Sequence, residues 1–205
     1  MHKIIVATGN KGKLREIREI CSGLPFEITS LSDHFNPVPV IPEDGATFLE
    51  NAQQKARWVY SRTRLWSLAD DSGLEVDFLG GLPGVRSARY AGERATDAQR
   101  IEKLLAACEK CPPDRRTARF RCVVVCKCGD TDEVVGEGTC EGRIGYGPKG
   151  TDGFGYDPVF LPSGYARTFA ELASQEKNAI SHRGKALAAL RRILDERFKS
   201  QYASL

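Results

Sequence analysis

The sequence lacks several features that would define a class of protein at once. No apolar run in its 205 residues approaches the length of a membrane-spanning helix. It contains no internal repeats, no low-complexity segments and no proline- or serine-rich linker. These absences exclude a helical membrane protein and a repeat protein. We therefore expect residues 1–205 to form a single domain, or two closely joined lobes.

The sequence also has little excess charge of one sign, because it contains 30 Lys and Arg residues and 27 Asp and Glu residues. A formal net charge of +3 gives no broad basic field, so we expect neither a stable nucleic-acid partner nor a membrane partner. The balance still allows a local basic pocket for a small anion. The segment Met1–Ala7 runs from a charged pair into a strand-like pattern without a signal-peptide layout, so we expect a cytoplasmic protein.

Seven cysteines are present, and an odd number argues against a secreted disulfide framework. Cys108 and Cys111 form a C-x-x-C motif, which is compatible with zinc or redox chemistry. No second C-x-x-C follows, and Cys122, Cys126 and Cys128 have strand-like spacing. We favour reduced structural thiols over a metal site.

Alternating strand and helix patterns predict an α/β fold with a long mixed sheet. Thr47 and Glu50 form a capping box, which predicts a helix from there to about Arg64. The acidic pair Asp70-Asp71 is expected to end a short strand. Other strands are predicted at Lys3–Ala7, Phe26–Leu31, Trp66–Ala69, Leu74–Leu79, Ala118–Lys127, Glu133–Ile144 and Pro158–Leu161, and other helices at Leu14–Cys21, Thr96–Cys111, Ala170–Glu176 and Ser181–Phe198.

The polar turn Thr8–Lys13 follows a predicted strand and opens a predicted helix. Backbone N–H groups at a helix N-terminus attract anions, and glycine lets a phosphate approach closely. Lys11 and Lys13 add positive charge. The glycine spacing differs from a Walker A motif, and an ordinary strand-to-helix turn with solvated lysines explains the segment equally well.

Carboxylates gather at two places along the chain. Glu43, Asp44 and Glu50 surround the start of one helix, and Asp70 and Asp71 are expected at a strand end, where ligands of open α/β sheets usually lie. A buried acidic pair is costly without a cation, and Mg²⁺ would offset that cost. Helix capping alone explains Glu50, whereas Asp71 favours a functional role.

The segment Phe154–Asp157 lies in a glycine-rich stretch. Two aromatic rings flanking a glycine can form a flat slot for a base, with Asp157 as a hydrogen-bond acceptor. The alternative is a pair of core aromatics beside a bend. Ser181 can cap the last helix, and Arg183 can donate to a base carbonyl.

Together these segments resemble the inosine triphosphate pyrophosphatases, also called the Ham1-like or dITP/XTP pyrophosphatases, and their bacterial branch in particular. The resemblance runs from Lys3 to about Leu190, and the order and spacing of its segments make it specific. Pro42 stands where some relatives have an acid. The residues that carry the resemblance are 7–17 (ATGNKGKLREI), 43–56 (EDGATFLENAQQKA), 69–92, 117–125, 147–160 (GPKGTDGFGYDPVF) and 176–187 (EKNAISHRGKAL).

The resemblance implies an elongated two-lobed fold with a long central mixed sheet flanked by helices, an active site in the cleft between the lobes, and a homodimer. It implies that Asp71 is the general base, that Glu43 and Asp71 bind Mg²⁺, and that Lys13 and Lys55 face the phosphates. The substrate-binding residues that it implies are Thr8, Gly9, Asn10, Lys11, Gly12, Lys13, Ser72, Phe154, Gly155, Tyr156, Asp157, Lys177, His182 and Arg183.

The activity that the resemblance implies is hydrolysis of deaminated purine nucleoside triphosphates (ITP, dITP and XTP) to monophosphate and pyrophosphate. Such an enzyme cleanses the nucleotide pool and prevents incorporation of these nucleotides into DNA and RNA. Two rival interpretations stay open at this point: a Maf-like pyrophosphatase acting on other nucleotides, and a non-catalytic nucleotide- or RNA-binding module. The binding module leaves the acidic residues without a role.

Overall fold

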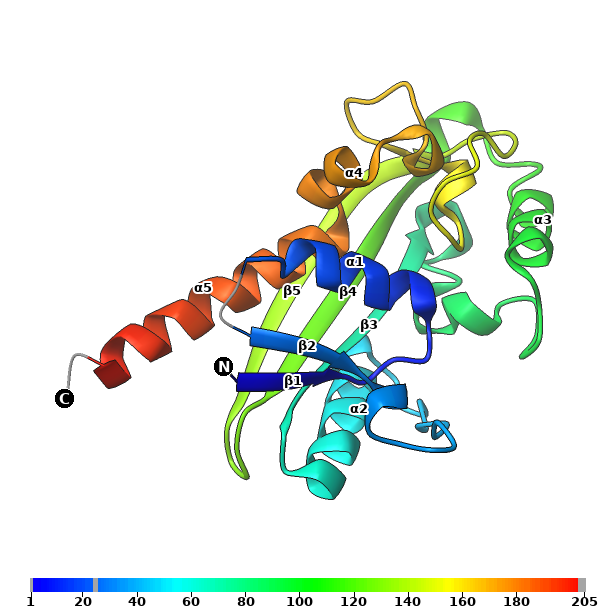
Figure 1. Ribbon diagram of the computed structural model, residues 1–205. Coiled ribbons are helices and arrows are strands. Elements are labelled where there is room, and N and C mark those ends of the chain that lie inside the picture. The colour runs from blue at the N-terminus through cyan, green and yellow to red at the C-terminus, as the bar shows by residue number, and fades with distance from the viewer. Residues whose placement is uncertain (1, 24–25, 203–205) are drawn as a thin grey trace. The chain divides into compact units, whose positions relative to one another are not determined.

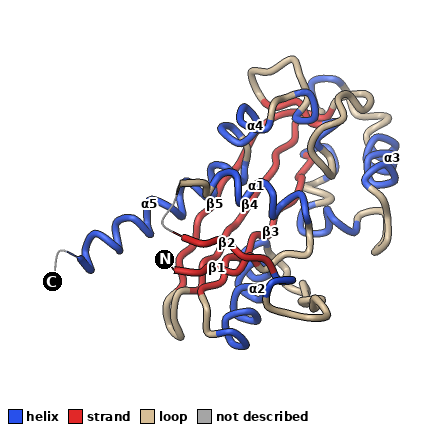
Figure 2. Tube along the Cα trace, in the orientation of Figure 1, coloured by secondary structure: helices blue, strands red, loops and turns tan. Residues whose placement is uncertain are grey.

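The computed structural model describes residues 2–23 and 26–202, and the chain divides into two compact units. Unit 1 comprises Met1–Asp71, Cys122–Gly138 and Arg183–Leu205, and unit 2 comprises Ser72–Arg121 and Thr139–His182. Within these described residues, six strands form a mixed sheet in the order β2-β1-β3-β4-β5-β6, flanked by helices (Figures 1 and 2). The predicted α/β class is therefore confirmed.

The strands of unit 1 surround β1 (His2–Val6), whose apolar run is buried as expected of a central parallel strand. It pairs in parallel with β2 (Phe26–Ser30) on one side and with the first part of β3 (Trp66–Val76) on the other. Parts of β4 (Thr117–Lys127) and β5 (Glu133–Ile144) complete this unit. The turn between β4 and β5 is closed by a hydrogen bond from the Cys128 N–H to the Asp132 carbonyl (3.0 Å).

Three helices cover the strands of unit 1: α1 (Lys11–Ile20), α2 (Phe48–Thr63) and α5 (His182–Tyr202), the last of which leaves only His182 in unit 2. The expected capping box starts α2, because Thr47 Oγ1 accepts the Glu50 N–H (3.1 Å) and Glu50 Oε2 accepts the Thr47 N–H (3.2 Å).

Helices α1 and α5 lie across one face of the unit 1 strands (Figure 1). Their apolar side chains pack on the strand residues of that face. Helix α5 lies so close to Gly136 of β5 that a Cβ atom added at this glycine would lie 2.3 Å from the Ala186 carbonyl oxygen. Any larger residue there would push α5 away from the sheet. The buried cluster on this face includes Ile4, Val6, Ile17, Leu68, Leu187, Leu190 and Leu194.

Unit 2 contains α3 (Asp97–Ala107), α4 (Ser174–Ile180) and β6 (Phe160–Pro162), which pairs antiparallel with the end of β5. Its core contains three phenylalanine rings from separate segments. The centroid of Phe120 lies 4.8 Å from that of Phe160, which lies 5.0 Å from that of Phe169. These side chains are at most 7% exposed.

The predicted break at Asp70-Asp71-Ser72-Gly73 is wrong, because β3 continues as one strand to Val76, three residues short of the predicted end at Leu79. The four residues have low strand propensity, but the side chains on both sides of them are buried and tertiary packing prevails over local preference. The acidic pair therefore lies inside a strand and not at its end. No helix within residues 2–23 and 26–202 is long and apolar enough to cross a membrane.

Several predicted helices have different bounds in the structure. Helix α1 begins at Lys11, three residues before the predicted Leu14, and α5 extends to Tyr202, four residues beyond the predicted Phe198. Helix α3 ends at Ala107, four residues before the predicted Cys111, because the chain turns at Cys108 and both cysteines enter the core of unit 2. The helix predicted at Ala170–Glu176 begins later, as α4, after a short 3₁₀ turn at Phe169–Glu171. All seven cysteines are free thiols.

Candidate functional site

The turn Thr8–Lys13 connects β1 to α1, and its own side chains set its shape. Asn10 is the N-cap of α1, since its Oδ1 accepts the Lys13 N–H at 3.1 Å. Thr8 Oγ1 accepts the Asn10 N–H at 3.2 Å. Gly9, Asn10 and Lys11 are exposed, and Gly12 and Lys13 are half-buried. The remaining N–H groups at the start of α1 can therefore bind an anion from solvent.

Asp70 of β3 is completely buried, and cationic side chains from two helices contact its carboxylate. Lys13 Nζ lies 3.1 Å from Asp70 Oδ2, and Arg183 donates to the same oxygen through Nε (3.3 Å) and Nη2 (3.1 Å). Arg183 Nη1 donates to the carboxylate of Glu16, which is only 4% exposed. The interior of unit 1 thus contains an ion network that joins α1, β3 and α5.

Contacts within the network shift the pKa of Asp70 and that of Arg183. Burial by itself would raise the pKa of Asp70, but Lys13, Arg183 and Lys55 together hold it well below its usual range. Burial opposes the charge of Arg183, and Asp70 and Glu16 nevertheless raise its pKa above the ordinary value. Asp70 and Arg183 are therefore both charged at neutral pH.

Neighbouring side chains of a strand point to opposite faces, so Asp71 faces α2 instead. Asn51 Nδ2 donates to Asp71 Oδ2 at 3.0 Å, and Lys55, one helical turn further along α2, places Nζ 3.7 Å from Asp71 Oδ1. The same ammonium donates to the Asp70 carbonyl (2.7 Å) and to the carboxylate of Glu43. Glu43 and Asp71 therefore face a common cation.

Burial raises the pKa of Asp71, although Lys55, Lys13 and the Asn51 hydrogen bond oppose the rise. Burial disfavours the charge of Lys55, yet Asp71, Asp70 and Glu43 raise its pKa above 10.5. A carboxylate with a raised pKa beside a firmly charged lysine is an arrangement typical of an acid–base site. Such a group can accept a proton from a water molecule next to it.

The charges on this side of unit 1 leave room for a further cation. On the side of β3 that faces α2, the carboxylates of Glu43 and Asp71 face the ammonium of Lys55, and carboxylate oxygens are the ligands that Mg²⁺ prefers. Across residues 2–23 and 26–202, no group of three or more His, Cys, Asp and Glu side chains is arranged to hold a metal ion.

In unit 2, four of the residues expected to bind the purine base, Phe154–Asp157, lie in the loop Gly153–Asp157. This loop is here called the base loop. Asp157 Oδ2 accepts the Phe154 N–H at 2.9 Å and pairs with Lys177 Nζ at 2.6 Å. Lys177 Nζ also lies 5.1 Å from the centroid of the Phe154 ring. Phe154 is half-buried, so the ring is held in place and can still present a surface to a ligand.

The other residues expected around the base are more buried. Tyr156 is 3% exposed and its hydroxyl donates to the Ser87 carbonyl at 2.9 Å, so this ring belongs to the core of unit 2. His182 is 4% exposed and stacks on Phe120, with ring centroids 4.6 Å apart. Ser72 is half-buried. Phe154 is therefore the aromatic ring of this loop that can stack on a base.

Sequence reasoning missed three polar residues that the structure connects to these sites: Glu16, Asn51 and Asp97. Glu16 follows Lys13 by three residues and Asn51 precedes Lys55 by four, so helical spacing could have placed both beside predicted site residues. Asp97 Oδ2 accepts the Gly155 N–H at 2.7 Å, a contact between residues 58 positions apart. No local pattern in the sequence could have shown that contact.

A family model confirms the resemblance. The model of the Ham1 family matches residues 4–193, which include every site residue described above. The chain belongs to the Ham1 family. This assignment rests on nearly the whole chain and on both units.

Individual relatives agree with the Ham1 assignment. The chain is 50% identical over 191 residues to a protein of Geobacter sulfurreducens named dITP/XTP pyrophosphatase, covering 93% of this chain and 96% of that protein. It is also 50% identical over 192 residues to the dITP/XTP pyrophosphatase of Vibrio parahaemolyticus, covering 93% and 95% of the two chains. A solved Ham1 protein of Coxiella burnetii superposes with a TM-score of 0.85 at 45% identity, covering 96% of this chain and 100% of that one.

Proposed function

We propose that this Ham1-family chain is a nucleoside triphosphate pyrophosphatase that hydrolyses ITP, dITP and XTP to the monophosphate and pyrophosphate. The observation that carries the proposal is the convergence of Glu43 and Asp71 on the Lys55 ammonium in unit 1, which also contains the helix-opening turn Thr8–Lys13. The names of the relatives supply the substrate class.

In this proposal, residues of unit 1 bind the phosphates of the substrate. The N–H groups at the start of α1 other than that of Lys13, together with the side chain of Lys13, bind phosphate oxygens, and Thr8 and Asn10 maintain the shape of the turn. Lys55 stabilises the negative charge that develops on the leaving pyrophosphate. Positioning and charge stabilisation of this kind supply most of the catalysis in phosphoryl transfer.

Asp71 acts as the general base. It orients a water molecule and takes its proton as the water oxygen attacks the α-phosphorus, and pyrophosphate leaves with the electron pair of the broken P–O bond. The raised pKa of Asp71 suits proton transfer, and the Asn51 hydrogen bond and Lys55 hold the carboxylate in place.

Glu43 and Asp71 are also the residues that would hold Mg²⁺. Both contact one ammonium group, which shows that their oxygens can face a common positive charge. When bound, Mg²⁺ supplies charge neutralisation of the phosphate oxygens and activates water.

In this proposal, residues of unit 2 bind the purine base: Phe154 stacks on it, and Lys177, His182 and Ser72 lie around it. A carbonyl at position six of the purine satisfies a nearby donor, whereas the amine of adenine leaves it unpaired, and such a mismatch discriminates strongly. Arg183 was expected to serve as that donor, and a direct contact with the base stays a prediction. Its bonds to Asp70 and Glu16 favour a role in positioning Asp70.

Pyrophosphate release from ITP, XTP, GTP and ATP, each with and without Mg²⁺, tests the proposal. We expect fast release from ITP and XTP only when Mg²⁺ is present, and slow release from ATP. Comparable rates on ATP and ITP would refute the selectivity, and activity on unrelated nucleotides alone would favour the Maf-like alternative. Nucleotide binding without any hydrolysis would identify a binding module.

The assembly and cellular role follow from the family resemblance alone. We propose a homodimer in the cytoplasm that removes deaminated nucleotides before polymerases use them. Light scattering on the purified protein measures the mass of the assembly. The frequency of hypoxanthine in DNA of cells lacking the protein measures the role.

A further inference from the structure

The base loop of unit 2 is held by two carboxylates that bind consecutive backbone N–H groups. Asp157 Oδ2 accepts the Phe154 N–H (2.9 Å), and Asp97 Oδ2 accepts the Gly155 N–H (2.7 Å). Asp157 belongs to the loop itself, whereas Asp97 belongs to α3. The peptide that follows the Phe154 ring is therefore fixed from outside the loop.

Asp97 is itself held in place. Arg100, one turn further along α3, donates to the second oxygen of the Asp97 carboxylate. Arg100 Nη1 also donates to the carbonyls of Ala88 (2.7 Å) and Ala95 (2.8 Å), so its guanidinium is anchored to the backbone on that side of the helix. The Asp97 carboxylate thus has a rigid partner on one oxygen and the base loop on the other.

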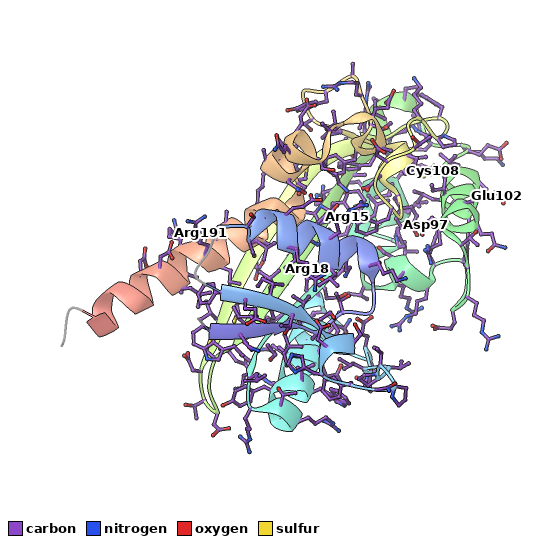
Figure 3. All side chains as sticks on the ribbon, in the orientation of Figure 1. Arg15, Arg18, Asp97, Glu102, Cys108 and Arg191 are labelled. Atoms are coloured by element: carbon purple, nitrogen blue, oxygen red, sulfur yellow. The ribbon has the colours of Figure 1, made fainter. Side chains whose placement is uncertain are left out.

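The direction of the side chain distinguishes Asp97 from the other acid of the same helix. In Figure 3, Asp97 lies on the side of α3 nearer the base loop, and Glu102 lies on the outer side. Both carboxylates are partly or fully exposed to solvent, but only the contact of Asp97 reaches the loop in the described part of the chain.

Gly155 adopts a φ of 61°, a conformation available at little cost to glycine, so the loop at this point has little stiffness of its own. Without an acceptor for the Gly155 N–H, the adjacent Phe154 ring loses one of the contacts that fix its position, beside those of Asp157 and Lys177. Small displacements of a binding group reduce affinity and rate strongly.

We propose that Asp97 is a positioning residue for base recognition, which acts by fixing the Gly155 N–H and with it the face of Phe154. The inference rests on the proposed function, because it assumes that the base loop binds the purine. It predicts that Asp97 determines affinity for the base portion of a ligand and leaves the phosphate portion unaffected.

An aspartate in the first turn of a helix also stabilises the helix through its charge, and this alternative requires no contact with Gly155. Asp97→Asn separates the two roles. The asparagine oxygen can still accept the Gly155 N–H, but the charge and the ion pair with Arg100 are gone. A positioning role is retained in Asp97→Asn and lost in Asp97→Ala, whereas a charge role is lost in both.

The experiment measures binding of IMP and of inorganic pyrophosphate by calorimetry, and KM and kcat for ITP, in the wild type and in Asp97→Ala, Asp97→Asn and Glu102→Ala. We expect Asp97→Ala to weaken IMP binding and raise KM by about tenfold, the loss of one charge-assisted hydrogen bond, with pyrophosphate binding unchanged. Asp97→Asn is expected to stay within about threefold of the wild type, by retention of a neutral hydrogen bond. Glu102→Ala should match the wild type.

Equal losses in Asp97→Ala and Asp97→Asn, or an unchanged affinity of Asp97→Ala for IMP, would overturn the inference. If Asp97→Ala does not fold, Asp97→Glu provides the same test, since it keeps the charge but moves the acceptor by one methylene group, and unchanged IMP binding there overturns the inference as well. A wild type that neither binds IMP nor releases pyrophosphate from ITP contradicts the proposed function instead, so the two failures are distinguishable.

Discussion

Asn51 Nδ2 donates to Asp71 Oδ2 at 3.0 Å, and the Oδ1 atom of the same amide accepts the Gly45 N–H at 2.8 Å. The buried Asn51 side chain of α2 therefore connects Asp71, the proposed general base, to the loop that carries Glu43. Both hydrogen-bonding functions of the Asn51 amide are used, which defines its orientation.

Replacing Asn51 by alanine leaves the Gly45 N–H and one Asp71 oxygen without this partner in a buried place. We expect a loss of about 1–3 kcal/mol in the free energy of unfolding, together with reduced activity, because an unpaired buried polar group costs about that much. Urea denaturation and pyrophosphate release measure the two effects. Gln54→Ala, on an exposed position of the same helix, is the control, and an equal loss of stability there would contradict the assignment.

Asp71→Asn should lower kcat by about two to four orders of magnitude, the usual contribution of a general base. The amide has the same size as the carboxylate, so the fold should be retained, which circular dichroism can verify. Asp44→Asn is the matched control because Asp44 is exposed and contacts Gln54 instead of Lys55. If Asp71→Asn turns over ITP at a near-normal rate, Asp71 has no part in proton transfer.

Arg183→Met should destabilise the protein by about 3–5 kcal/mol, because it leaves the carboxylates of Asp70 and Glu16 buried without their partner. Arg191→Met, on the same helix, removes an exposed arginine that pairs with Asp195 at 3.5 Å, and should cost less than about 1 kcal/mol. Chemical denaturation of both variants measures the difference. Similar values for the two would contradict a structural role for the buried network.

Glu133 gives a prediction about acid stability. A bidentate bond from Arg57 (2.5 and 2.8 Å), assisted by Lys127, lowers the pKa of Glu133 from its ordinary value of 4.5. A lowered pKa in the folded state means that the carboxylate stabilises the fold above pH 4.5, and that this contribution is lost as the pH falls through the folded value. Glu133→Gln should therefore lower the Tm at neutral pH, and the gap to the wild type should close in acid. A difference in Tm between Glu133→Gln and the wild type that does not change with pH would contradict this prediction.

The local elements were predictable from the sequence because their signals are local. The capping box at Thr47 and Glu50 predicted the start of α2, and alternation at Ala118–Lys127 predicted β4 to within one residue of its observed bounds, Thr117–Lys127. Both patterns depend on residues within one turn or one strand. The same reasoning failed at Ser72-Gly73, where local propensity predicted a break and packing on both sides of the chain maintained β3.

The sequence by itself determined the family, the class of fold and the residue types at the site, since short segments in a characteristic order carry all three. Only the tertiary structure decided which charges meet. It paired Asp70 with Arg183, 113 positions away, turned Asp71 toward Asn51 and Lys55, and placed Tyr156 in the core. The reason is physical: the free energy of a buried ion pair or hydrogen bond depends on the surrounding burial and on partners distant in sequence, and no local pattern contains that information.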